Sequence, residues 1–112
     1  MSTETYFTTP GATWRQGDLL FRRIEDLPLE NLTERENGHI LEGEATGHIH
    51  RLKDTVVAKV LETFAGLRMF IRAEKPAEII HEDHDTITLP PGNYEVIRQR
   101  EYTPEAIRQI AD

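Results

Sequence analysis

The stretch GHILEGEATGHIHRL runs from Gly38 to Leu52 and organises the predicted fold. Side chains of an extended strand alternate between two faces, so His48 and His50 should share one face while Ile49 lies on the other. The same alternation gives the histidine face Glu42, Glu44 and Thr46, and the opposite face Leu41 and Ala45. We expect one long strand or two short ones, with an apolar face and a face of metal-binding residue types. A bulge at Gly47 would change the parity of the glutamates but not that of the histidine pair.

The segments that flank this stretch favour further short strands. Apolar and β-branched residues between turn signals predict strands at residues 19–24, 77–81, 86–89 and 94–102. Residues 55–73 are predicted to form a β-hairpin that turns at Ala65-Gly66, and the alternative is one helix over residues 56–70. A short helical turn is expected at residues 31–36. Thr103-Pro104-Glu105 predicts a helix over residues 104–111, because threonine can cap a helix and proline suits its first position.

These elements predict an all-β fold, either a small β-barrel or a two-sheet sandwich with a short C-terminal helix. Residues 1–13 are small and polar and are expected to form a flexible N-terminal arm. Residues 14–112 should then form a single β domain, because 112 residues suffice for one modest core.

Composition restricts the function classes. With 13 basic and 20 acidic residues the net charge is −7, which disfavours binding to duplex nucleic acid but permits a small anionic ligand held by local arginines. There is no cysteine, so disulfides, thiolate ligands and a thiol nucleophile are excluded. The sequence shows neither a secretory signal nor an apolar run of about 20 residues, so we expect a cytoplasmic protein without membrane contact. Because only 38% of residues are hydrophobic, self-association into a homo-oligomer is one way to bury more surface.

Four of the five histidines form the pairs His48/His50 and His81/His84. Two imidazoles at positions i and i+2 of a strand can bind one ion at Zn–N distances of about 2.0–2.1 Å, provided that further ligands come from elsewhere. His81 should end one strand and His84 should lie in the following turn, so either can supply the next ligand. We therefore predict a metal site of His48, His50 and His81, completed or supported by His84 or Glu44.

Two carboxylates beside the second pair, Asp83 and Asp85, are candidates for a further ligand or for orienting an imidazole. Without cysteine, the ion must be held by nitrogen and oxygen, so the expected cofactor is a divalent transition metal: zinc, manganese, iron or nickel. A catalytic site of this kind would activate water or polarise a substrate oxygen, as in a metal-dependent hydrolase or isomerase. Glu44 is then the candidate catalytic carboxylate.

Two alternatives need no metal. In the first, the protein is a non-enzymatic binding or oligomerisation module whose histidines line a contact. In the second, two histidines with Arg51 or Arg100 cleave a phosphodiester of RNA or a nucleotide, because histidine can transfer protons near neutral pH and arginine stabilises the developing charge. The strand over residues 94–102 would place Arg98 and Arg100 on one face, where they either bind an anion or form ion pairs on an outer strand.

The HxH at residues 48–50, followed by Leu89-Pro90-Pro91-Gly92, resembles part of the cupin pattern. In cupins an HxH strand and a later Pro-x-Gly turn flank a metal in a small β-barrel, so the resemblance implies a β-barrel with histidine ligands. The sequence departs from that pattern at Glu42, Asp54 and Glu95, where cupins have glycine, glutamate and histidine. We therefore make no family assignment from these positions.

Overall fold

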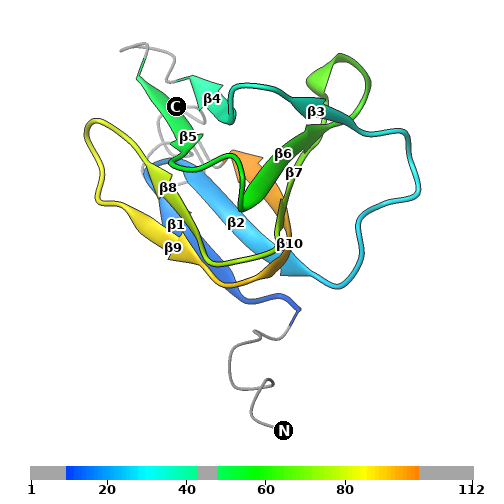
Figure 1. Ribbon diagram of the computed structural model, residues 1–112, viewed down its shortest axis with the longest axis horizontal. Coiled ribbons are helices and arrows are strands. Elements are labelled where there is room, and N and C mark those ends of the chain that lie inside the picture. Colours follow the sequence, from blue (N-terminus) through cyan, green and yellow to red (C-terminus); the bar gives the residue numbers. More distant parts are fainter. Residues whose placement is uncertain (1–9, 43–47, 99–112) are drawn as a thin grey trace, which may run out of the picture.

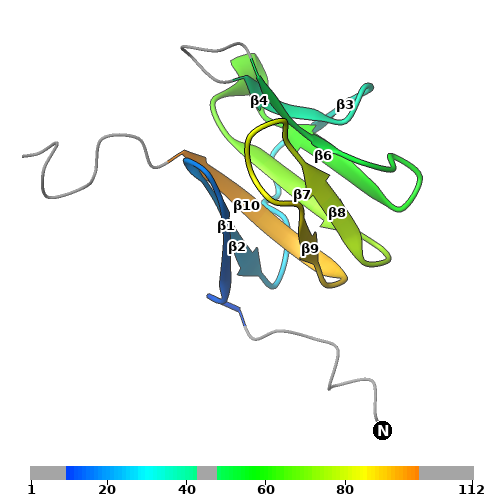
Figure 2. The ribbon, with the colours of Figure 1, turned by 90° about the vertical axis from the view of Figure 1, so that its left-hand side faces the viewer.

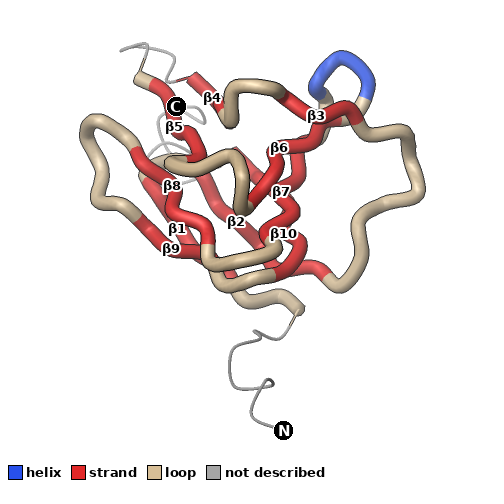
Figure 3. The backbone as a smooth tube through the Cα atoms, in the orientation of Figure 1, coloured by secondary structure: helices blue, strands red, loops and turns tan. Residues whose placement is uncertain are grey.

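Ten β-strands make up most of residues 10–42 and 48–98, which are the residues that the computed structural model describes (Figure 1). In chain order the strands are β1 (Thr13–Gln16), β2 (Leu19–Ile24), β3 (Thr33–Arg35), β4 (His39–Glu42), β5 (Ile49–Leu52), β6 (Ala58–Glu62), β7 (Met69–Ala73), β8 (Ala77–Ile80), β9 (Ile87–Leu89) and β10 (Gly92–Arg98). One 3-10 helix, η2 (Phe64–Gly66), is the only helical element in this part of the chain (Figure 3).

The strands form two antiparallel sheets (Figures 1 and 2). The large sheet has the order β1-β2-β10-β7-β6-β3, and the small sheet has the order β4-β5-β8-β9. The prediction of an all-β fold is confirmed. Of the two architectures expected, the open two-sheet sandwich is the one found, and the sheets do not close into a barrel. The helix predicted over residues 104–111 lies outside the described residues.

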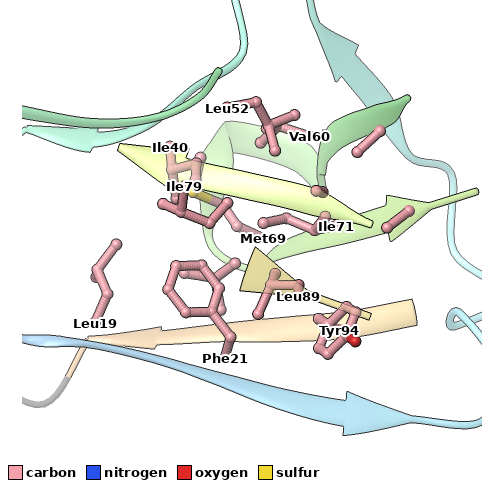
Figure 4. Close-up of a cluster of buried hydrophobic side chains, with 14 residues drawn as sticks. Leu19, Phe21, Ile40, Leu52, Val60, Met69, Ile71, Ile79, Leu89 and Tyr94 are labelled. Carbon is pink, nitrogen blue, oxygen red and sulfur yellow. The ribbon is translucent and has the colours of Figure 1, made fainter. Parts of the chain in front are cut away.

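The hydrophobic core lies between the two sheets (Figure 4). In most strands, alternate side chains point inward and build this core, as the period of two requires. Leu19 and Phe21 point inward from β2, and Tyr94 points inward from β10; all three are 0% exposed. Trp14 of β1 packs edge-on against Tyr94, with ring centroids 5.5 Å apart. The sequence did not predict β1. The residues directly before β1 are also paired with β2, since the Gly11 N–H donates to the carbonyl of Arg23.

The organising stretch folds as two strands, β4 and β5, which pair with each other in antiparallel register. In β5 the side with the histidine is the inner one, because His50 and Leu52 are buried whereas Ile49 is half-buried and Arg51 is exposed. His50 therefore points into the protein. Alternation alone does not say which face is inside; a polar residue can take the inner face when a buried partner satisfies it. Residues 43–47, with Glu44, lie outside the described residues.

The hairpin predicted over residues 55–73 is confirmed, and the helical alternative is wrong. β6 and β7 pair from Ala58↔Ala73 to Glu62↔Met69, and η2 makes the turn. The helical turn expected at residues 31–36 is replaced by β3, which pairs with the free edge of β6. Edge pairing overrides a weak local preference, because it satisfies backbone groups that the helical turn would leave to water.

β10 runs between β2 and β7 inside the large sheet. The expectation of an outer strand is therefore wrong, because both edges of this strand form backbone ladders. The strand ends at Arg98, and the predicted continuation through Arg100 to residue 102 lies outside the described residues. Within residues 10–42 and 48–98, no helix has the length and apolar character of a membrane span.

Candidate functional site

The two histidine pairs lie next to each other in space. β5 pairs with β8 in the register Arg51↔Ile80, so one step further along the ladder His50 faces His81. Their ring centroids are 4.2 Å apart. The loop from β8 to β9 then returns His84 to the same place, 4.7 Å from the ring of His81 and 6.1 Å from that of His50. His48, directly before β5, lies 5.8 Å from His81. We call these residues, His48, His50, His81 and His84, the four-histidine group.

His50 is the buried member of the group, at 1% exposure. Its Nδ1 lies 2.8 Å from Oε1 of Gln16, which is itself 2% exposed. The orientation of this amide is set by its other end, because Nε2 of Gln16 donates to the carbonyls of Ile79 and Asp85 at 2.8 and 2.9 Å. Oε1 of Gln16 must therefore accept, and His50 must donate through Nδ1–H. The Nε2 atom of the neutral His50 ring then carries a lone pair.

Asp18 faces that lone pair. Its Oδ1 is 3.4 Å from Nε2 of His50, and its Oδ2 is 3.3 Å from Nε of Arg98. Asp18 belongs to the turn between β1 and β2, so this carboxylate comes from the large sheet while the histidines come from the small one. Arg98, at the end of β10, forms an ion pair with the other oxygen of this carboxylate.

Asp83 organises two other members of the group. Its Oδ2 is 2.5 Å from Nδ1 of His48. Its backbone N–H donates to Nδ1 of His81 at 3.0 Å. In the neutral form His81 therefore carries its hydrogen on Nε2, the opposite tautomer to His50.

His84 packs against Gly17. The glycine has φ +60°, and a Cβ placed on it would lie 2.5 Å from Nε2 of His84. No side chain other than hydrogen fits at this position with the ring where it is. The β1–β2 turn thus contributes three neighbouring residues to the site: Gln16, Gly17 and Asp18.

Burial sets the protonation of the inner rings. It lowers the pKa of His50 from 6.5 to about 4, with the nearby His81 acting in the same direction and Asp18 opposing it. Burial and the neighbouring His84 also lower the pKa of His81. Both imidazoles are therefore neutral near pH 7, which is the state that a metal ion requires of its ligands.

Of the remaining candidates from the sequence, two take other positions beside this group and two lie outside the described residues. Arg51 follows His50 on β5 and points to the opposite, solvent-exposed face. There it lines a surface hollow of about 130 Å³ with Ile49, Ile80, His81 and Glu82. Asp85 contributes its backbone carbonyl to Gln16. Glu44 and Arg100 are outside the described residues.

Sequence reasoning missed Gln16, Gly17 and Asp18. The strand predicted at residues 19–24 begins directly after Gly17-Asp18, and nothing local distinguishes a buried glutamine from an exposed one. Among the described His, Cys, Asp and Glu side chains, no three stand in the arrangement of a formed metal site.

The described chain is thus a two-sheet β sandwich in which four imidazoles lie close together. Residues 15–99 match the family described as "Domain of unknown function (DUF8820)", and the chain belongs to this family. The matched segment includes the four-histidine group and the turn that packs against it. No curated protein matches the chain. No solved structure matches it either.

Proposed function

We propose that this domain binds one divalent transition-metal ion through the four-histidine group. The observation that carries the proposal is the approach of imidazoles from two distant stretches of the chain to ring separations of 4.2, 4.7, 5.8 and 6.1 Å. Tetrahedral coordination at Zn–N distances of about 2.0–2.1 Å would put bound ring centres roughly 5 Å apart. The observed separations lie on both sides of that value.

Ring tautomers support the same reading for two members. His48 and His50 each use Nδ1 for a hydrogen bond, to Asp83 and Gln16 respectively, so each ring would bind an ion through Nε2. Metal-bound histidines commonly have this arrangement, in which a second partner orients the ring. His81 differs, because its Nδ1 accepts from the backbone of Asp83. Binding through His81 would break that bond and turn the ring.

Nitrogen ligands without thiolate suit zinc, nickel and iron, and manganese if oxygen ligands contribute. If a coordination position stays open, the ion would activate water or polarise a substrate oxygen, which is the chemistry of a hydrolase or an isomerase. The hollow beside His81 contains Arg51 and has room for a small anionic ligand. A cytoplasmic location stays a prediction from the sequence.

Metal analysis and titration of protein without a histidine tag test the proposal. We expect one zinc, manganese, iron or nickel ion per chain. His50→Ala and His81→Ala should each weaken binding of the preferred metal by at least about tenfold, because each removes a ligand.

The fifth histidine supplies a matched control. His39 lies in β4 and makes no ring contact with the group among the described residues, so His39→Ala should bind metal like the wild type. Absence of bound and bindable zinc, manganese, iron and nickel from the wild-type protein would rule the proposal out.

A second candidate, an assembly module, is favoured by a different surface. Leu29, Phe64 and Leu67 are 104%, 88% and 80% exposed. Their two loops are joined by an ion pair between Glu30 and Arg68 at 3.2 Å, so these apolar side chains gather on one part of the molecule. Light scattering in excess chelator tests this candidate: a homo-oligomer that survives chelator, and that Phe64→Ser dissociates, would support it.

A further inference from the structure

We infer that Asp18 is the oxygen ligand of this metal, so that the site is assembled from both sheets of the sandwich. The inference rests on the metal binding proposed above and adds to it a residue that the sequence does not mark. It follows from how Asp18 and His50 face each other.

The distance between the two groups is the first support. Oδ1 of Asp18 and Nε2 of His50 are 3.4 Å apart. A charge-assisted N–H···O bond is about 2.7–2.9 Å long, so this separation is too large for a good one. Two atoms bound to one tetrahedral zinc, at about 2.0–2.2 Å from the ion, lie about 3.4 Å from each other. The pair therefore has the spacing of two ligands on a common ion.

The hydrogen-bond network is the second support. Gln16 receives the only hydrogen of the neutral His50 ring, because its amide is fixed by the carbonyls of Ile79 and Asp85. Nε2 of His50 and Oδ1 of Asp18 then present lone pairs to each other. Two facing acceptors repel unless a proton or a metal ion lies between them, and the buried ring cannot turn away without breaking its bond to Gln16.

Arg98 lies beside the other oxygen of the carboxylate. Its Nε is 3.3 Å from Oδ2 of Asp18, which is an ion-pair distance, while Oδ1 faces His50 at 3.4 Å. One oxygen would thus bind the ion while the other stays next to the guanidinium charge. With histidine nitrogens and one oxygen, the ligand set has the mixed character of catalytic zinc sites.

Zinc affinity of full-length, untagged protein tests the inference, measured by competition with a chromophoric chelator. Asp18→Asn should weaken zinc binding by at least about tenfold. Asp26→Asn removes the same charge from an exposed position beyond the far end of β2 and should leave the affinity within about twofold of wild type. Arg98→Met removes the ion pair but keeps the ligand, so it should cost less affinity than Asp18→Asn.

The outcomes separate the two proposals. Equal zinc affinity of wild type and Asp18→Asn overturns the role of Asp18 and leaves metal binding intact. Failure of the wild-type protein to bind zinc or another of the expected metals overturns metal binding itself. If Asp18→Asn does not fold, carboxylate ¹³C NMR of the wild type decides: the Asp18 signal should shift when zinc binds and that of Asp26 should not. An unmoved Asp18 signal contradicts the inference.

Discussion

At the scale of single residues, Gly17 shows how closely the β1–β2 turn fits the histidines. It has φ +60°, and a Cβ would meet the ring of His84 at 2.5 Å. Gly11 also has a positive φ, +96°, but a Cβ there would meet nothing within 4 Å. Substitution of Gly11 by alanine therefore measures the cost of a positive φ alone, whereas substitution of Gly17 measures that cost together with displacement of the His84 ring.

We predict that Gly17→Ala and Gly11→Ala each lower the free energy of unfolding by about 1–2 kcal/mol, because L-residues are strained at positive φ. Only Gly17→Ala should also move His84 and weaken metal binding. Urea unfolding measures the first effect, and histidine NMR spectra with a zinc titration measure the second. An unchanged His84 signal in Gly17→Ala would contradict the described packing.

At the scale of elements, one side chain of β1 connects the two sheets. β1 is an edge strand that pairs only with β2. From this edge, Gln16 reaches the carbonyl of Ile79 in β8, the carbonyl of Asp85 in the next loop and the ring of His50 in β5. The bonds to Ile79 and His50 are buried and the bond to Asp85 is partly buried, so the groups left unpaired are costly when the glutamine is lost.

We predict that Gln16→Met lowers the free energy of unfolding by about 2–3 kcal/mol, since it fills the same space but satisfies none of the three partners. The ¹⁵N spectrum of His50 should also show loss of the single Nδ1–H tautomer. Thr13→Val is the matched control, because Thr13 is an exposed residue of the same strand and should change stability by no more than about 0.5 kcal/mol. A stable Gln16→Met with an unchanged His50 spectrum would contradict this role.

At the scale of the whole molecule, His50 couples folding to pH. Its pKa is about 4 in the folded protein against 6.5 for an ordinary histidine, because burial disfavours the charged ring. Between pH 4 and pH 6.5 the ring of His50 binds more protons in the unfolded chain than in the folded one. The contribution of His50 to the free energy of unfolding is therefore fully present above pH 6.5 and is lost as the pH falls toward 4. The lowered pKa of His81 acts in the same direction.

We predict that metal-free protein in chelator loses up to about 3 kcal/mol of unfolding free energy between pH 7.5 and pH 4 through His50. Urea unfolding at several pH values measures this. The slope between pH 7 and pH 5 is the most informative, because most carboxylates keep their charge there. His50→Gln should have a flatter slope, and equal slopes for both proteins would show that His50 does not carry the effect.

Across the whole chain, local patterns predicted much of the fold. Period-two alternation and turn residues suffice for β2, for the β6–β7 hairpin and for the return from β8 to β9, since these depend on neighbours in sequence. The N-terminal edge strand and the short β3 escaped prediction. Each of them forms because it pairs with an edge of the large sheet, β1 with β2 and β3 with β6, and so satisfies backbone hydrogen-bonding groups there.

The sequence by itself determined the strand-rich fold class and the residue types able to hold a metal. The tertiary structure decided that the two histidine pairs meet, that His50 points inward, and that Gln16 and Asp18 stand beside it. The reason is physical: Gln16 and Ile79 are 63 positions apart, and only the packing of one sheet on the other brings their polar atoms within hydrogen-bonding distance. Alternation along a strand predicts which residues share a face, but contacts with the opposite sheet determine which face is buried.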